Sequence, residues 1–184
     1  MCEALNLGRT PLREELSQLQ IEGYLELTPN KGLIITKLSA QNVNEIYQII
    51  AVLEGFAVEI ATRNFKKDDQ NKIRLVHRDL EKACNLNDKR MWMEKNVIFH
   101  EYLVRASGNE FLTSLINSLR NRIYRYRFIA LTMSDPLRLS HSAHKEVLKY
   151  VFMKDGKMAS RAMQSHVLAV AENLMNVLSR YPEV

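Results

Sequence analysis

Along most of the chain, apolar residues recur every three or four positions, which is the spacing of helices that bury one face. From Ser39 to the C-terminal end this period predicts six helices, separated by residues typical of turns and helix caps. Their expected ranges are 39–63, 68–86, 88–106, 110–131, 137–155 and 157–179.

The first 38 residues have a different pattern. A helix of roughly 12 residues is expected to begin at Thr10, a suitable N-cap, with Pro11 in its first turn. Two short β-rich runs follow, at 24–27 and 33–36, on either side of a turn at 29–32. This pattern predicts a β-hairpin.

The change of period divides the chain into two predicted domains, 1–38 and 39–184. Hydrophobic residues make up 46% of the 184 positions, which excludes a disordered chain. Six glycines and four prolines are too few for a β-sandwich or barrel, so composition also favours a mainly α protein. Two cysteines indicate a reducing compartment, and no apolar run approaches the roughly 18 residues of a membrane span, so we expect a cytoplasmic protein.

The net charge of +5 suggests a polyanionic partner, but its distribution weakens that argument. Residues 1–38 carry four Lys and Arg against five Glu, so the positive excess lies in 39–184. An argument for DNA binding must therefore rest on specific residues at specific positions, and not on the net charge.

Such residues occur at the start of the first helix. Arg9, Thr10 and Arg13 surround its N-terminus, and Gly32 follows at the hairpin turn, as a winged helix-turn-helix requires. Helix amide groups and arginines can meet phosphates and base edges there, and a glycine lets the wing approach DNA closely. A simple helix-hairpin cap on a helical domain would show the same periodicity, so both interpretations remain open at this point.

The amino-acid sequence of this segment resembles the recognition helix and wing of GntR-family transcription factors. The resemblance lies in Leu-Gly-Arg-Thr-Pro-Leu-Arg-Glu at 7–14, Glu-Gly-Tyr-Leu at 22–25 and Pro-Asn-Lys-Gly at 29–32. It implies that Arg9, Thr10 and Arg13 contact a palindromic operator, with Lys31 and Gly32 at the wing. Family members carry a further helix before this motif, so we expect a partial winged helix-turn-helix here.

From Ser39 onward the chain resembles the FCD ligand-sensing domain of the FadR branch of that family. Glu-Ile-Tyr at 45–47, Leu-Glu-Gly at 53–55, Phe-His at 99–100 and Ser-Gly-Asn at 107–109 carry this resemblance. It implies an antiparallel bundle of six or seven helices that forms a homodimer, senses a small-molecule effector and, in many members, holds a divalent metal.

Three histidines lie on the apolar faces of three predicted helices: His100, His144 and His166. A single core histidine is usually a hydrogen-bonded structural residue, but three facing one core could bind a metal. Asn96, one turn before His100, would add an oxygen ligand, and the set suits Zn, Ni or a similar ion. The family pattern has Asp where this chain has Asn96, so water or an effector carboxylate could replace that ligand.

Two further histidines receive different interpretations. His141 lies one turn before His144 and is expected to face inward as well, whereas His77 lies in a charged helix and is expected to be solvated.

An effector pocket is expected to involve Tyr47, Arg120 and Tyr124. Many relatives have an arginine where this chain has Ile50, so a clamp for an organic acid is absent at that position. Arg120 could compensate, although most of the basic run at 120–127 is expected to face solvent or a dimer partner.

These features predict a bacterial transcriptional regulator, acting as repressor or activator, rather than an enzyme. A sensing and dimerisation module without its own DNA binding is the alternative. A histidine-ligated metalloenzyme would need a general base beside the metal. On the histidine-bearing helices only Glu101 and Glu146 are near, and their spacing points them elsewhere.

Overall fold

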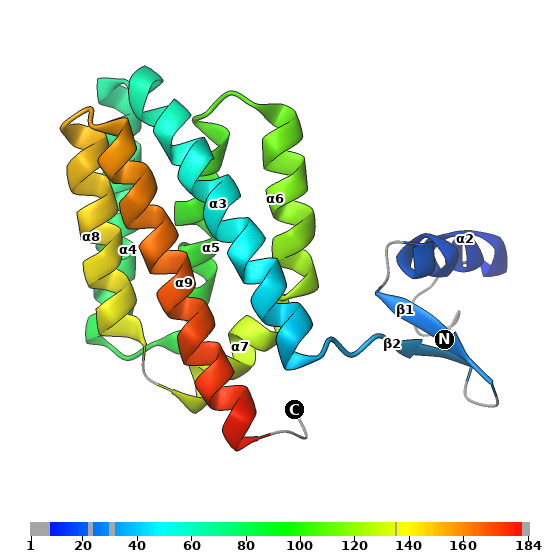
Figure 1. Cartoon of the computed structure of the whole chain (residues 1–184). Helices are drawn as coiled ribbons and strands as arrows, with labels where there is room; N and C mark the ends of the chain where they lie inside the picture. The colour runs from blue at the N-terminus through cyan, green and yellow to red at the C-terminus, as the bar shows by residue number, and fades with distance from the viewer. Residues whose placement is uncertain (1–7, 22–23, 30–31, 135, 182–184) are drawn as a thin grey trace. The chain divides into compact units, whose positions relative to one another are not determined.

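A computed structural model of the chain describes residues 8–21, 24–29, 32–134 and 136–181, and the chain forms two compact units, 1–39 and 40–184 (Figure 1). The first unit contains α2 (Arg9–Ile21) and the antiparallel strands β1 (Leu25–Thr28) and β2 (Gly32–Ile35). The predicted helix and hairpin are therefore both present. Gly32, paired with Thr28, has a φ of 75°, a conformation that side chains with a Cβ rarely adopt.

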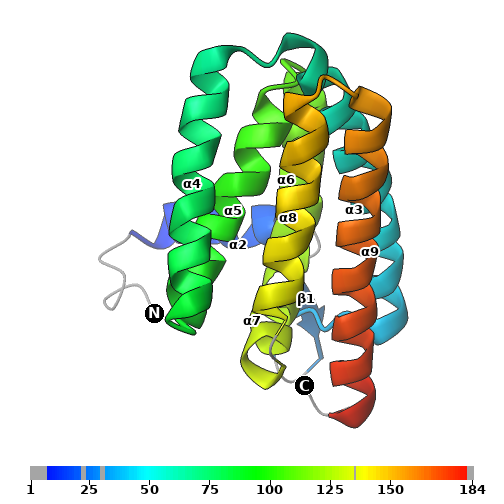
Figure 2. The ribbon, with the colours of Figure 1, turned by 90° about the vertical axis from the view of Figure 1, so that its left-hand side faces the viewer.

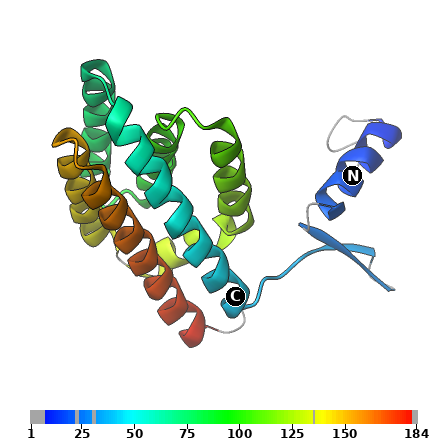
Figure 3. The same cartoon turned by 45° about the horizontal axis from the view of Figure 1, so that its top comes forward.

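The second unit contains seven helices within the described residues, in an antiparallel bundle (Figures 1 and 2). They are α3 (Ala40–Asn64), α4 (Lys67–Asn85), α5 (Lys89–Arg105), α6 (Glu110–Arg122), α7 (Tyr124–Met133), α8 (Leu137–Phe152) and α9 (Gly156–Arg180). The two longest, α3 and α9, lie side by side over much of their length (Figure 3). The mainly α fold, with a helical bundle after a helix-hairpin unit, is confirmed.

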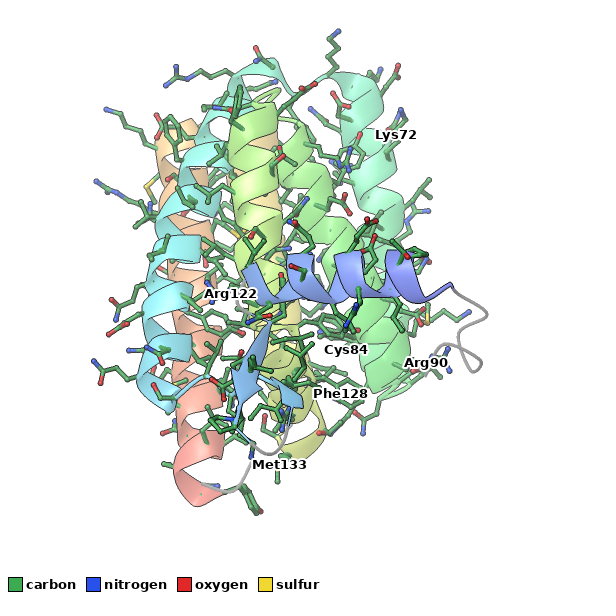
Figure 4. All side chains as sticks on the ribbon, turned by 90° about the vertical axis from the view of Figure 1, so that its right-hand side faces the viewer. Lys72, Cys84, Arg90, Arg122, Phe128 and Met133 are labelled. Atoms are coloured by element: carbon green, nitrogen blue, oxygen red, sulfur yellow. The ribbon has the colours of Figure 1, made fainter. Side chains whose placement is uncertain are left out.

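One predicted helix is wrong. The expected helix at 110–131 is divided at Ile123, whose φ of −102° and ψ of 4° end α6 before α7 begins. Ile123 is buried and keeps the helical spacing of its apolar neighbours, and neither glycine nor proline marks the break. The periodicity of apolar residues therefore continues across Ile123, although the helix is broken there. Phe128 and Met133 of α7 lie at the lower end of the bundle in Figure 4.

The predicted ranges of the other five helices agree with the observed ones to within about three residues. Among the described residues, no helix is both long and apolar enough to cross a membrane.

Candidate metal centre

Three buried imidazoles meet inside the bundle. His100 comes from α5, His144 from α8 and His166 from α9, and none is more than 5% exposed. The Nε2 atom of His166 lies 3.0 Å from that of His144 and 3.3 Å from that of His100. The structure thus brings together the three histidines that the helical spacing placed on inward faces.

This arrangement fits a divalent metal ion. Zn–N bonds of about 2.0–2.1 Å at tetrahedral angles place two ligand nitrogens about 3.3 Å apart, which is close to the separations observed. One ligand nitrogen from each ring lies within 4.8 Å of the other two. Imidazole nitrogens suit Zn, Ni and other first-row ions.

The surroundings keep these rings neutral, as metal ligation requires. Burial lowers the pKa of His166 to about 4. Burial also holds the pKa of His100 well below its usual range, helped by the nearby Arg120 cation, and does the same for His144, helped by His166. At neutral pH the three rings therefore carry lone pairs rather than positive charge.

A fully buried carboxylate, Glu54 of α3, lies beside the histidines. Its Oε2 atom is 2.8 Å from Nδ1 of His100. Its Oε1 accepts a hydrogen bond from Nε of Arg120 at 2.6 Å and forms an ion pair with Nη2 of Arg120 at 2.5 Å. A carboxylate at Nδ1 favours the tautomer protonated there, which leaves the Nε2 lone pair facing the other two rings. Sequence reasoning missed this residue, although Glu54 does interrupt the apolar run 46–61. The sequence argument considered only the carboxylates on the histidine-bearing helices, whereas the carboxylate beside His100 comes from a fourth helix, α3.

A cavity of about 70 Å³ adjoins the centre. His100, His166 and Glu54 form part of its wall, together with residues from several helices: Tyr47, Ile50, Asn96, Arg120 and Arg127. The hydroxyl of Tyr47 is buried without a hydrogen-bond partner among the described residues, and burial raises the Tyr47 pKa to about 12. Two arginines and an unpaired hydroxyl therefore face a small space next to the imidazoles.

Two of the three predicted effector residues line this cavity. Tyr47 and Arg120 line the cavity, but Tyr124 does not and is 49% exposed. The break at Ile123 changes which residues of this segment face inward, so that Arg127 of α7 occupies the wall instead. Asn96 faces the same cavity one turn from His100, as its spacing predicted.

His77 was predicted to be solvated, but the structure places it partly inside the bundle. Its ring stacks on His141 at a centroid distance of 4.5 Å, and its Nε2 is buried without a partner among the described residues. Burial lowers the His77 pKa to about 4, with the neighbouring His141 and Lys145 acting in the same direction. Although α4 is polar overall, His77 lies on the face that carries the buried Ile73 and Leu80.

The partly buried His77 is expected to make stability sensitive to acid. The unfolded chain protonates this imidazole below about pH 6.5, whereas the folded chain does so only near pH 4. Its contribution is therefore complete above pH 6.5 and is lost as pH falls toward 4. We expect the melting temperature of the metal-free protein to fall between pH 7 and 5, and His77→Phe to make that fall smaller. Equal falls in the two proteins, measured by differential scanning fluorimetry, would contradict this assignment.

The predicted DNA-contacting residues lie in the first unit. Thr10 and Arg13 are exposed in the first turns of α2, and Gly32 begins β2. Arg9 is the first residue of α2, but its side chain lies outside the described part of the chain, as does Lys31.

Comparison with known proteins gives a consistent result. A family model described as "FCD domain" matches residues 45–169. An HTH-type transcriptional repressor of Escherichia coli, GlaR, is 30% identical over 88% of this chain and 77% of its own length. An uncharacterised HTH-type transcriptional regulator of Bacillus subtilis, YdhC, is 27% identical over all of this chain and 82% of its own length.

Solved structures show the same fold. The structure of E. coli McbR/YncC has a TM-score of 0.83 at 21% identity and covers 98% of this chain and 84% of that one. The metal-free FCD domain of TM0439 has a TM-score of 0.66 at 18% identity and covers 79% of this chain and all of that one.

Proposed function

The chain belongs to the GntR family of transcriptional regulators, in the branch with an FCD domain, and we propose that a divalent metal and a small organic anion control its binding to operator DNA. The observation that carries this proposal is the convergence of three neutral imidazole nitrogens beside a cavity lined by two arginines. His100, His144 and His166 would hold the metal, with Asn96 near enough along α5 to supply an oxygen. Family membership also favours a regulator over an enzyme, and we place it in the cytoplasm with its DNA.

An anionic effector is supported by the charges around the cavity. Arg120 and Arg127 bring two guanidinium groups, of which Arg120 is paired with Glu54. The unpaired Tyr47 hydroxyl can donate a hydrogen bond to an oxygen of the effector. A metal would add positive charge to the same wall and offer a position to a carboxylate oxygen. The volume of about 70 Å³ suits an acid of a few carbon atoms.

Arg127 provides the test of the effector site. We expect short mono- and dicarboxylates to raise the melting temperature of the Zn²⁺-loaded protein, and Arg127→Gln to weaken the best of them about tenfold or more, because a hydrogen bond to a charged group is lost. Arg161→Gln, at an exposed position of α9, is the matched control. No response to any carboxylate, or equal responses in both variants, would remove the anion from the proposal.

Regulation requires two DNA-reading units, because a palindrome has two half-sites. A ligand changes the occupancy of the operator only if it binds more tightly to one arrangement of the two DNA-reading units than to another. A second copy of the chain would account for an exposed apolar face on the adjacent helices α3 and α6. Its residues are Ile49, Val52 and Phe56 of α3 and Phe111 and Leu115 of α6, each at least 50% exposed.

We therefore expect sedimentation equilibrium to give twice the monomer mass of 21.4 kDa. The double variant Phe56→Glu with Phe111→Glu should shift that equilibrium toward monomer, because two charges would be buried unpaired in the interface. The pair Leu75→Glu with Leu139→Glu, which adds the same two charges at exposed positions of α4 and α8, is the control. A wild-type monomer at micromolar concentration would exclude the dimer.

A further inference from the structure

The two oxygens of Glu54 have different partners. Oε2 lies 2.8 Å from Nδ1 of His100, and Oε1 is paired with the guanidinium of Arg120. Glu54 is fully buried in the middle of α3, and its partners come from α5 and α6. One carboxylate thus joins three helices at the wall of the metal centre.

Charge balance alone explains only one of these contacts. A buried guanidinium needs a counter-ion, and Arg120 obtains it from Oε1. The second oxygen is directed instead to an imidazole that burial keeps neutral. A neutral ring adds little to the charge balance of the pair. Its contact satisfies the second buried oxygen and at the same time fixes the orientation of the His100 ring.

We propose that Glu54 is a positioning residue for metal binding, which orients His100 and makes its Nε2 a stronger ligand. This inference rests on the proposed metal function. A carboxylate that accepts from one imidazole nitrogen fixes the tautomer and ring orientation and raises the basicity of the other nitrogen. Nδ1 of His144 is buried without any partner among the described residues, whereas Nδ1 of His100 lies within hydrogen-bond distance of Glu54.

The substitution Glu54→Gln removes the charge but keeps the size and an acceptor oxygen. We expect it to weaken Zn²⁺ binding by about 10- to 100-fold, the range typical for such outer partners of metal ligands. Binding is measured by competition with a chromogenic chelator at constant pH. Glu59→Gln, about one and a half turns along the same helix and paired with the exposed Arg63, should leave the affinity unchanged.

Glu54→Gln also leaves Arg120 buried without a counter-ion, which could disturb the fold. The double variant Glu54→Gln with Arg120→Met removes both charges and restores neutrality. If Glu54 positions His100, the double variant also binds Zn²⁺ about 10- to 100-fold more weakly than the wild type. If Glu54 serves only as the counter-ion of Arg120, the double variant regains wild-type affinity and the inference is overturned.

A second measurement needs no metal. In the metal-free wild type, ¹⁵N NMR of the imidazoles should show His100 protonated at Nδ1, because this nitrogen faces Glu54. In the double variant this preference should decline. A wild-type protein that fails to bind Zn²⁺ while His100 keeps this tautomer would contradict the proposed metal function alone, whereas His100 protonated at Nε2 would contradict the role of Glu54.

Discussion

Replacing His144 with alanine is expected to abolish the stabilisation of this protein by divalent metal. His144 supplies one of three convergent nitrogens, so its loss should weaken binding by more than the roughly 10- to 100-fold caused by losing an outer partner. A metal present at about 100 times its dissociation constant stabilises the fold by about 2.7 kcal/mol. For a chain of this length that is roughly 5–10 °C in melting temperature.

The measurement compares the shift caused by Zn²⁺ or Ni²⁺ within each variant, so that any loss of packing in the metal-free protein cancels. His77→Ala is the matched control, because His77 is a partly buried histidine of the same bundle outside the triad. Elemental analysis of the purified proteins gives the metal content directly. An undiminished shift for His144→Ala, or an absent shift for the wild type, would eliminate the metal from the proposed function.

The fold could be predicted from sequence in part because three helices, α5, α6 and α9, begin at residues with known capping chemistry. Asp88, Asn109 and Asp155 each accept a hydrogen bond from a backbone amide in the first turn of the following helix. Ile123 shows the limit of the method. The backbone changes direction there without a cap, a glycine or a proline, so only the packing of α6 and α7 against the bundle reveals the break.

The site was predictable where its residues follow helical periodicity, and not where it depends on contacts between helices. Spacing within α5, α8 and α9 placed the three histidines inward without knowledge of their neighbours. Glu54 and His100 are 46 positions apart, and no periodicity connects residues on different helices. His77 was misjudged because the average polarity of α4 concealed its narrow apolar face.

These two kinds of residue have different consequences for regulation. The histidines define a place for a cation, but the polar residues around the cavity determine which anion can accompany it. With the apolar Ile50 in the wall, the guanidinium groups of Arg120 and Arg127 remain the cationic contacts along this cavity. The acid group of the effector is therefore expected to lie toward α6 and α7, within reach of the Tyr47 hydroxyl of α3.

At the other end of the chain, Arg13→Ala is expected to weaken operator binding about 10- to 100-fold. Arg13 is exposed in the first turns of α2, where helix amides and basic side chains can meet DNA. Loss of an arginine that contacts a base costs about 1–3 kcal/mol and relaxes specificity at that position. If Arg13 contacts a phosphate instead, its loss should weaken binding to all sequences alike. The slope of the logarithm of the binding constant against the logarithm of the salt concentration should then become smaller by about one.

Fluorescence anisotropy with duplexes from the region upstream of the gene, at two salt concentrations, separates these outcomes. Arg161→Ala removes the same charge from an exposed position in the helical bundle and should leave binding unchanged. Equal losses in both variants would mean that overall charge, which is concentrated in residues 39–184, drives the interaction. If the wild-type chain binds no duplex at all, the sensing and dimerisation module becomes the better description, because an exposed helix-hairpin unit alone would not then suffice to read DNA.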